Sequence, residues 1–164
     1  MINYLKVSFG IFLALAVSRF VPHPPNFTSL IALSFYVPAI LGIKYLPALI
    51  FSFFITDMFI GFHNLMFFTW GSVIIIAYIS NYFIKNLSTR IIGVLLSAVI
   101  YFIITNFGSW FLKDIYLINL DGIILAYTLA LPFFYQSLIS TVLFSVFFEI
   151  LINKTKVVFT KKSI

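Results

Sequence analysis

Long apolar runs separated by short polar breaks make up nearly all of this 164-residue chain. Six runs are candidate membrane-spanning helices, covering residues 4–20, 28–42, 47–60, 65–84, 91–110 and 137–152. A helix needs roughly 20 apolar residues to cross a bilayer, so the shorter runs predict tilted helices or a locally thin membrane. Residues 111–122 predict an interfacial or partly re-entrant connection, and Pro132 is expected to end a short helix before the sixth span.

The composition of the chain, taken together with this pattern, predicts the fold class. Hydrophobic residues make up 63% of the chain and charged residues 9%, whereas a soluble domain is about half apolar and about a quarter charged. We therefore expect an all-α integral membrane protein, a compact bundle of six transmembrane helices that forms a single domain over residues 1–164. The chain has no cysteine, which excludes disulfides and thiolate chemistry.

The basic residues predict the orientation of the bundle. With both termini in the cytoplasm, most of them lie on the cytoplasmic side: Lys6, Lys44, Lys85, Arg90, Lys154, Lys156, Lys161 and Lys162. Only Arg19 and Lys113 lie toward the outside. The positive-inside rule favours this topology, and we expect the protein in a bacterial cytoplasmic (inner) membrane. The net charge of +6 then needs no nucleic-acid partner.

The polar residues that are costly in lipid gather at the outer ends of the predicted spans. The candidate ligand-binding residues are Arg19, His23, Asn26, Asp57, His63, Trp70, Asn106 and Trp110. The inner halves of the same spans are aliphatic and aromatic. This asymmetry predicts an outward-facing polar and aromatic pocket for a small molecule, with the proline-rich loop at residues 22–25 above it.

Several of these residues also have a structural interpretation. Arg19 and Asp57 are expected to pair between the first and third spans, to contact a ligand, or both. Trp70 and Trp110 are either pocket aromatics or members of an interfacial belt. His63 shares a face with Phe67 and Trp70 if the fourth helix starts early. The histidines and Asp57 match no metal-binding spacing, so neither a metal nor a cofactor is predicted.

Small residues recur at every fourth position of the first span, at Gly10, Ala14 and Ser18. Such a stripe allows close approach of helices in lipid. It predicts packing within the bundle or, alternatively, docking of a partner membrane protein. Glu149 is expected at the inner interface rather than in a catalytic role.

Four motifs carry a resemblance over nearly the whole chain: RFVPHPPNFT (19–28), SFFITDMFIGFH (52–63), TNFGSW (105–110) and AYTLALPFF (126–134). With them the chain is similar to a family of small bacterial and algal membrane proteins known only as a domain of unknown function. More distantly, it resembles the S components of energy-coupling-factor (ECF) vitamin transporters. That resemblance implies six spans, an outward pocket capped by the loop after the first span, and docking of the first helix on an energising module of ATPases and a membrane coupling subunit.

The function that we expect is a membrane subunit that binds a micronutrient, a vitamin or its precursor, for uptake, and not an enzyme. The chain has no phosphate-binding glycine loop, so any ATP hydrolysis belongs to a partner. One alternative is an integral membrane enzyme that uses Asp57 and His63 as acid and base. Another is an ion- or proton-coupled carrier, which needs polar residues across the whole membrane.

Overall fold

The structure is a computed structural model that describes residues 2–112 and 115–155. Lys113, Lys156, Lys161 and Lys162, which entered the predicted topology, therefore lie outside the described residues. The described residues form six α-helices and no strand. The helices are α1 (Ile2–Phe20), α2 (Leu30–Tyr36), α3 (Leu46–Ile60), α4 (Met66–Ser80), α5 (Leu87–Leu112) and α6 (Leu120–Thr155). Two single turns of 3₁₀-helix, Ile43–Tyr45 and Asn81–Phe83, precede α3 and follow α4.

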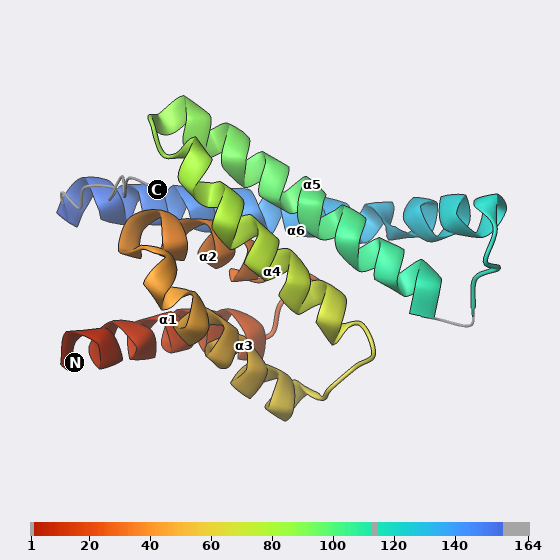
Figure 1. The fold of residues 1–164 in the computed structure, drawn as a ribbon, viewed down its shortest axis with the longest axis horizontal. Coiled ribbons are helices and arrows are strands. Elements are labelled where there is room, and N and C mark those ends of the chain that lie inside the picture. Colours follow the sequence, from red (N-terminus) through yellow and green to blue (C-terminus); the bar gives the residue numbers. More distant parts are fainter. Residues whose placement is uncertain (1, 113–114, 156–164) are drawn as a thin grey trace.

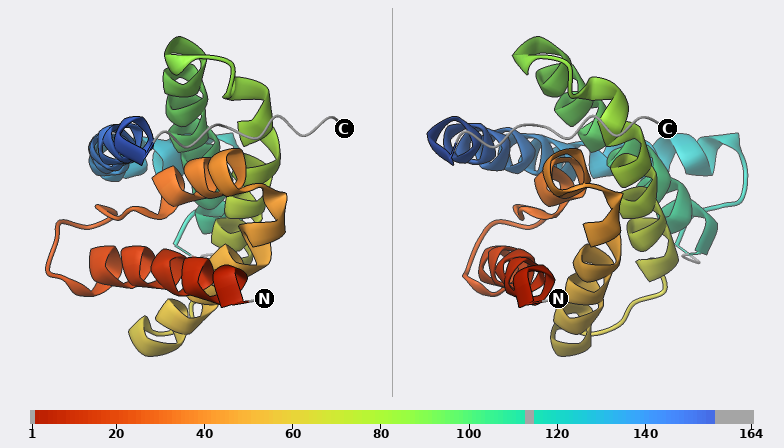
Figure 2. Two further views of the ribbon diagram at one scale, coloured as in Figure 1. Left: turned by 90° about the vertical axis from the view of Figure 1, so that its left-hand side faces the viewer. Right: turned by 60° about the vertical axis from the view of Figure 1, so that its left-hand side comes forward.

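The helices pack around α2 (Figures 1 and 2). On one side α1 lies along α3, and on the other side α5 lies along both α4 and α6. α2 contacts α4, α5 and α6, and has fewer contacts with α1. The connections from α3 to α4 and from α5 to α6 lie at one end of the molecule, opposite the start of α1 and the end of α6 (Figure 1).

α2 is a core helix. Its 7 residues continue into a π-helix of 5 residues, Val37–Leu41, and every residue from Leu30 to Ala39 is buried. At 1.5 Å per residue the two segments span about 18 Å, well short of a bilayer core of roughly 30 Å. The run at 28–42 is thus helical as predicted, but it is too short and too buried to be an ordinary lipid-facing span.

Four segments of the described chain are long and apolar enough to cross a membrane: Ile43–Ile60, Met66–Phe83, Leu87–Leu112 and Leu120–Lys154. Their outward faces carry exposed Phe, Leu and Ile side chains, for example Phe59, Phe67 and Leu129. Such a surface is stable against acyl chains and not in water. The prediction of an all-helical membrane protein is confirmed at this level.

The prediction that Pro132 divides the last apolar block is wrong. α6 continues through Pro132 as one helix of 36 residues. Proline removes one backbone donor, which interrupts a helix in water more readily than in a membrane protein, where neighbouring helices hold the segment in place. The predicted connection at 111–122 is shorter than expected as well, because α5 extends to Leu112 and α6 begins at Leu120.

Buried serines lie at the helix contacts. Ser34, Ser52, Ser72, Ser80 and Ser97 are each at most 2% exposed, and each hydroxyl donates to a carbonyl three or four residues earlier in its own helix. Their polar groups are therefore satisfied without a partner helix. Small side chains of this kind allow helices to approach closely in lipid.

Candidate ligand-binding cavity

An ion pair joins α1 to α3. Arg19 Nη1 lies 2.6 Å from Asp57 Oδ1, a charge contact without the angles of a directed hydrogen bond. The same Nη1 donates to Thr56 Oγ1 at 2.5 Å, and the guanidinium lies 4.7 Å from the centre of the Phe53 ring. Trp70 of α4 donates from Nε1 to Asp57 Oδ2 at 2.8 Å. Asp57 is 1% exposed, and such a buried carboxylate is tolerated only when it is paired in this way.

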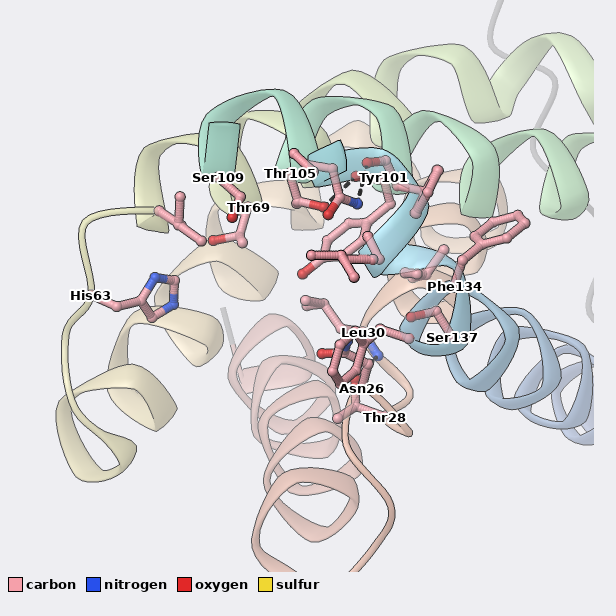
Figure 3. Close-up of a pocket in the computed structure, with 18 of the residues that line it drawn as sticks. Asn26, Thr28, Leu30, His63, Thr69, Tyr101, Thr105, Ser109, Phe134 and Ser137 are labelled. Atoms are coloured by element: carbon pink, nitrogen blue, oxygen red, sulfur yellow. Dashed lines mark hydrogen bonds between the residues drawn. The ribbon is translucent and has the colours of Figure 1, made fainter. Parts of the chain in front are cut away.

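A cavity of about 630 Å³ lies beside this pair (Figure 3). Its walls come from all six helices, from the α1–α2 loop and from the connections that precede α4 and α6. The volume is within the range of small-molecule sites, about 300–1,000 Å³. Arg19 lines the cavity, but Asp57 does not.

The loop between α1 and α2 follows from its PHPPN sequence. The Phe27 amide donates to the Pro24 carbonyl at 3.1 Å, which closes a turn with Pro25 and Asn26 at its two central positions. Asn26 has φ 62°. Proline followed by a residue with positive φ is typical of a type II turn, and asparagine tolerates this conformation better than most residues do. The turn holds Asn26 and His23 at the cavity wall.

Two helical faces supply most of the remaining lining. On α5, Tyr101, Thr105 and Ser109 recur at every fourth position, and Figure 3 shows the Tyr101 ring projecting into the middle of the cavity. On α6 the lining residues from Ala126 to Ser137 follow the 3.6-residue period. None of these residues was among the predicted ligand contacts. On α5 the sequence contains one signal, a hydroxyl-bearing residue at every fourth position, but it points to a cavity only when the packing of α5 is known.

Five of the eight predicted ligand-binding residues line the cavity: Arg19, His23, Asn26, His63 and Asn106. The other three do not. Asp57 and Trp70 lie behind Arg19, bonded to each other. Trp110 donates to the Leu117 carbonyl at 3.0 Å and so ties the end of α5 to the next connection.

The structure does not bring Asp57 and His63 together as an acid–base pair. Both carboxylate oxygens of Asp57 face Arg19 or Trp70, whereas His63 is exposed in the α3–α4 connection. The early start of the fourth helix, on which a shared face of His63, Phe67 and Trp70 depended, is not observed, because α4 begins at Met66. Within the described ranges, no three His, Asp or Glu side chains are grouped as a metal site.

The small-residue stripe on α1 packs partly within the bundle. Ser18 accepts a hydrogen bond from the Ser29 amide at 3.1 Å, and the Ser29 hydroxyl lies 3.3 Å from the Ala14 carbonyl. Gly10 and Ala14 remain exposed and line an apolar groove that also contains residues of α2 and α6. Docking of a partner on this stripe stays a prediction.

A second, partly buried ion pair lies toward the opposite end of the bundle. Arg90 of α5 donates from Nε and Nη2 to the two Glu149 oxygens of α6, at 2.6 and 2.8 Å. Tyr36 of α2 donates to Glu149 Oε1 at 2.8 Å. The sequence predicts Arg90 in the connection before the fifth span and Glu149 at the inner interface, but it does not reveal that the two residues pair.

Four apolar helices of spanning length and a polar-lined cavity near one end of the bundle define an α-helical membrane protein. The chain belongs to a family of unknown function (DUF6580), which matches residues 2–160. The predicted membership of such a family is thus confirmed. No curated protein and no solved structure matches the chain, and the more distant resemblance to the S components of ECF transporters stays a prediction.

Proposed function

We propose that this protein is a binding subunit for the uptake of a small molecule, a micronutrient such as a vitamin or its precursor. It captures this molecule in the cavity beside Arg19, with the α1–α2 loop as the cap. The molecule then passes inward, with energy from a partner that hydrolyses ATP. The six helical segments and the position of the cavity support an arrangement like that of an S component in a bacterial inner membrane.

The single observation that carries the proposal is the cavity, together with the polar groups that its lining leaves available to a ligand. The Tyr101 hydroxyl and two nitrogens of Arg19 have no hydrogen-bond partner among the described residues. Polar groups that are held by a rigid bundle and lack partners favour a ligand with complementary groups. A protein that only holds helices together has no need of such a cavity.

The test is native mass spectrometry of the gently extracted protein, in search of a small molecule that co-purifies. Ala130, which is 8% exposed and lines the cavity, is replaced by Phe to fill the space without removing a charge. We expect the wild type to carry a bound molecule and Ala130→Phe to lose it. Thr128→Leu, an exposed change on the same helix outside the lining, is the matched control and keeps the molecule.

Two outcomes contradict the proposal. One is a folded wild type that carries no small molecule and binds none when it is supplied. The other is a bound molecule that Ala130→Phe retains, because the molecule then lies elsewhere. Melting curves of all three proteins identify a loss that comes from unfolding alone.

A further inference from the structure

The permanent charge among the described residues that line the cavity is of one sign, positive. Arg19 is the only Lys or Arg among the described lining residues, and no Asp or Glu is among them. Two histidines, His23 and His63, also line the cavity. The counter-charge of Arg19, Asp57, lies behind it and outside the lining. A ligand in the cavity therefore meets a guanidinium and no carboxylate from this part of the chain.

The guanidinium of Arg19 is held with one edge free. Nη1 is engaged by Asp57 and Thr56, while Nε and Nη2 bond to no described residue. A cation–π contact with the Phe53 ring further holds the group in place. An arginine presents paired donors along each edge, and a free edge matches the two oxygens of a carboxylate. The pairing with Asp57 thus positions Arg19 without using all of its donors.

Another part of the cavity lining consists of aromatic rings. Phe102, Phe133 and Phe134 line the cavity together with the Tyr101 ring, so α5 and α6 contribute a group of aromatic rings to the wall. Aromatic side chains pack well against flat rings in offset or edge-to-face geometry. The cavity therefore combines one cationic corner with an aromatic wall.

We propose that the cavity binds a small ring-bearing carboxylic acid, with its carboxylate on the free edge of Arg19 and its ring against the aromatic wall. This inference deepens the proposed function and rests on it. The hydroxyl of Tyr101 is a further donor for the same ligand. A phosphate ester fits less well, since its two charges meet a single arginine.

The test compares compounds that differ in one substituent only. Indole-3-acetate, indole-3-acetamide and tryptamine present an acid, an amide and an amine on the same ring, and benzoate, benzamide and benzylamine repeat the series on a smaller ring. Binding to the purified full-length protein is measured by calorimetry. We expect the acids to bind roughly 10- to 100-fold more tightly than the amides and amines, as for a hydrogen-bonded charge.

Variants then assign this preference to Arg19. Arg19→Gln is expected to abolish the preference for the acid, whereas Asp57→Asn retains or increases it, because the negative charge behind Arg19 is removed. The matched control is Arg90→Gln, which breaks the other, partly buried ion pair at a residue outside the lining. It is expected to lower stability but to keep the preference. Tyr101→Phe weakens acid binding with little change in melting temperature.

The possible results distinguish a failure of the carboxylic-acid proposal from a failure of the proposed binding function. Equal affinity for acid and amide, or a preference for the amine, overturns the acid but leaves the binding function intact. A co-purified molecule that is neutral or cationic does the same. If no compound binds at millimolar concentration and nothing co-purifies, both proposals fail. If Arg19→Gln does not fold, Arg19→Lys, which keeps the charge and loses the paired donors, replaces it and is expected to bind acids more weakly than the wild type does.

Discussion

Arg19 combines a structural role with a place in the cavity wall. A charged residue in the membrane interior costs roughly 2.5–3.5 kcal/mol on insertion scales, and Asp57, Thr56 and the Phe53 ring offset this cost. The two interpretations of the pair that the sequence left open are compatible in this geometry. The tie between α1 and α3 is present, and Arg19 still lines the cavity.

At the residue scale, Gly108 of the TNFGSW motif marks a close approach of α5 to α4. A Cβ atom at this position would overlap the ring of Phe68. Gly108→Ala is expected to destabilise the protein by about 1–3 kcal/mol, as for other overpacked contacts. The measurement is the midpoint of thermal unfolding in detergent, together with SDS titration.

Gly10→Ala is the matched control for Gly108→Ala. Gly10 also lies in a long helix, but nothing lies within 4 Å of an added Cβ atom. The change is expected to leave stability unchanged within about 0.5 kcal/mol, or to raise it slightly through helix propensity. Equal losses for both variants would show that the contact with Phe68 has no special role.

The sequence reveals only some of the residues at the cavity. Charged, amide and imidazole side chains are conspicuous in an apolar chain, and five of the predicted residues do line the cavity. Tyr101 and Ser109 are common in membrane helices, so they become informative only when the helical faces that meet are known. Trp70 and Trp110 are conspicuous in the sequence and were predicted to line the cavity, but they do not. A tryptophan serves equally well as a hydrogen-bond donor to a neighbouring segment, which is what both residues do.

At the element scale, three helices are joined by the network of Arg90, Glu149 and Tyr36. The side chains of the ion pair are 11% and 14% exposed. Removal of one partner from a fully buried pair costs about 3–5 kcal/mol, and this partly exposed pair is expected to contribute less. We predict a loss of about 2 kcal/mol for Glu149→Gln and about 1 kcal/mol for Tyr36→Phe, which removes one hydrogen bond.

The same unfolding assay tests this prediction. Lys85→Gln is the control, since Lys85 is an exposed residue that precedes α5, and its effect is expected within about 0.5 kcal/mol. If Glu149 is only an interfacial residue, then Glu149→Gln has no larger effect than Lys85→Gln. The order Glu149→Gln, Tyr36→Phe, Lys85→Gln, from the largest loss to the smallest, supports the network.

The helices themselves follow from the apolar runs, and five of the predicted spans both begin and end within a few residues of the observed helical segments. The failures have a common cause. Hydrophobicity alone does not distinguish a helix that faces lipid from one that faces only protein, so the short core helix α2 resembles a span. Proline likewise predicts a helix end only where nothing else holds the helix in place, and α6 packs against both α5 and α2.

At the scale of the whole molecule, polar clusters lie on both sides of an apolar layer. Ile31 lines the cavity and packs in a buried cluster with Phe35, Ile76 and Val94. Tyr36 of the same cluster reaches Glu149 on the far side. This layer separates the cavity from the second ion pair. Inward passage of a ligand under the proposed function therefore needs a rearrangement of helices, which is the step expected of an energising partner.

The orientation of the bundle is testable because the chain has no cysteine, so a single introduced cysteine reports its own accessibility. Asn64 and Asn81 are exposed residues at the two ends of α4, and Asn64 adjoins His63 in the cavity wall. Since basic residues mark the cytoplasmic side, Asn64→Cys is expected to react with a membrane-impermeant maleimide in intact spheroplasts. Asn81→Cys is expected to react only after permeabilisation. Labelling of Asn81→Cys alone would place the cavity in the cytoplasm and exclude capture from outside, while labelling of both would mean that α4 does not cross the membrane.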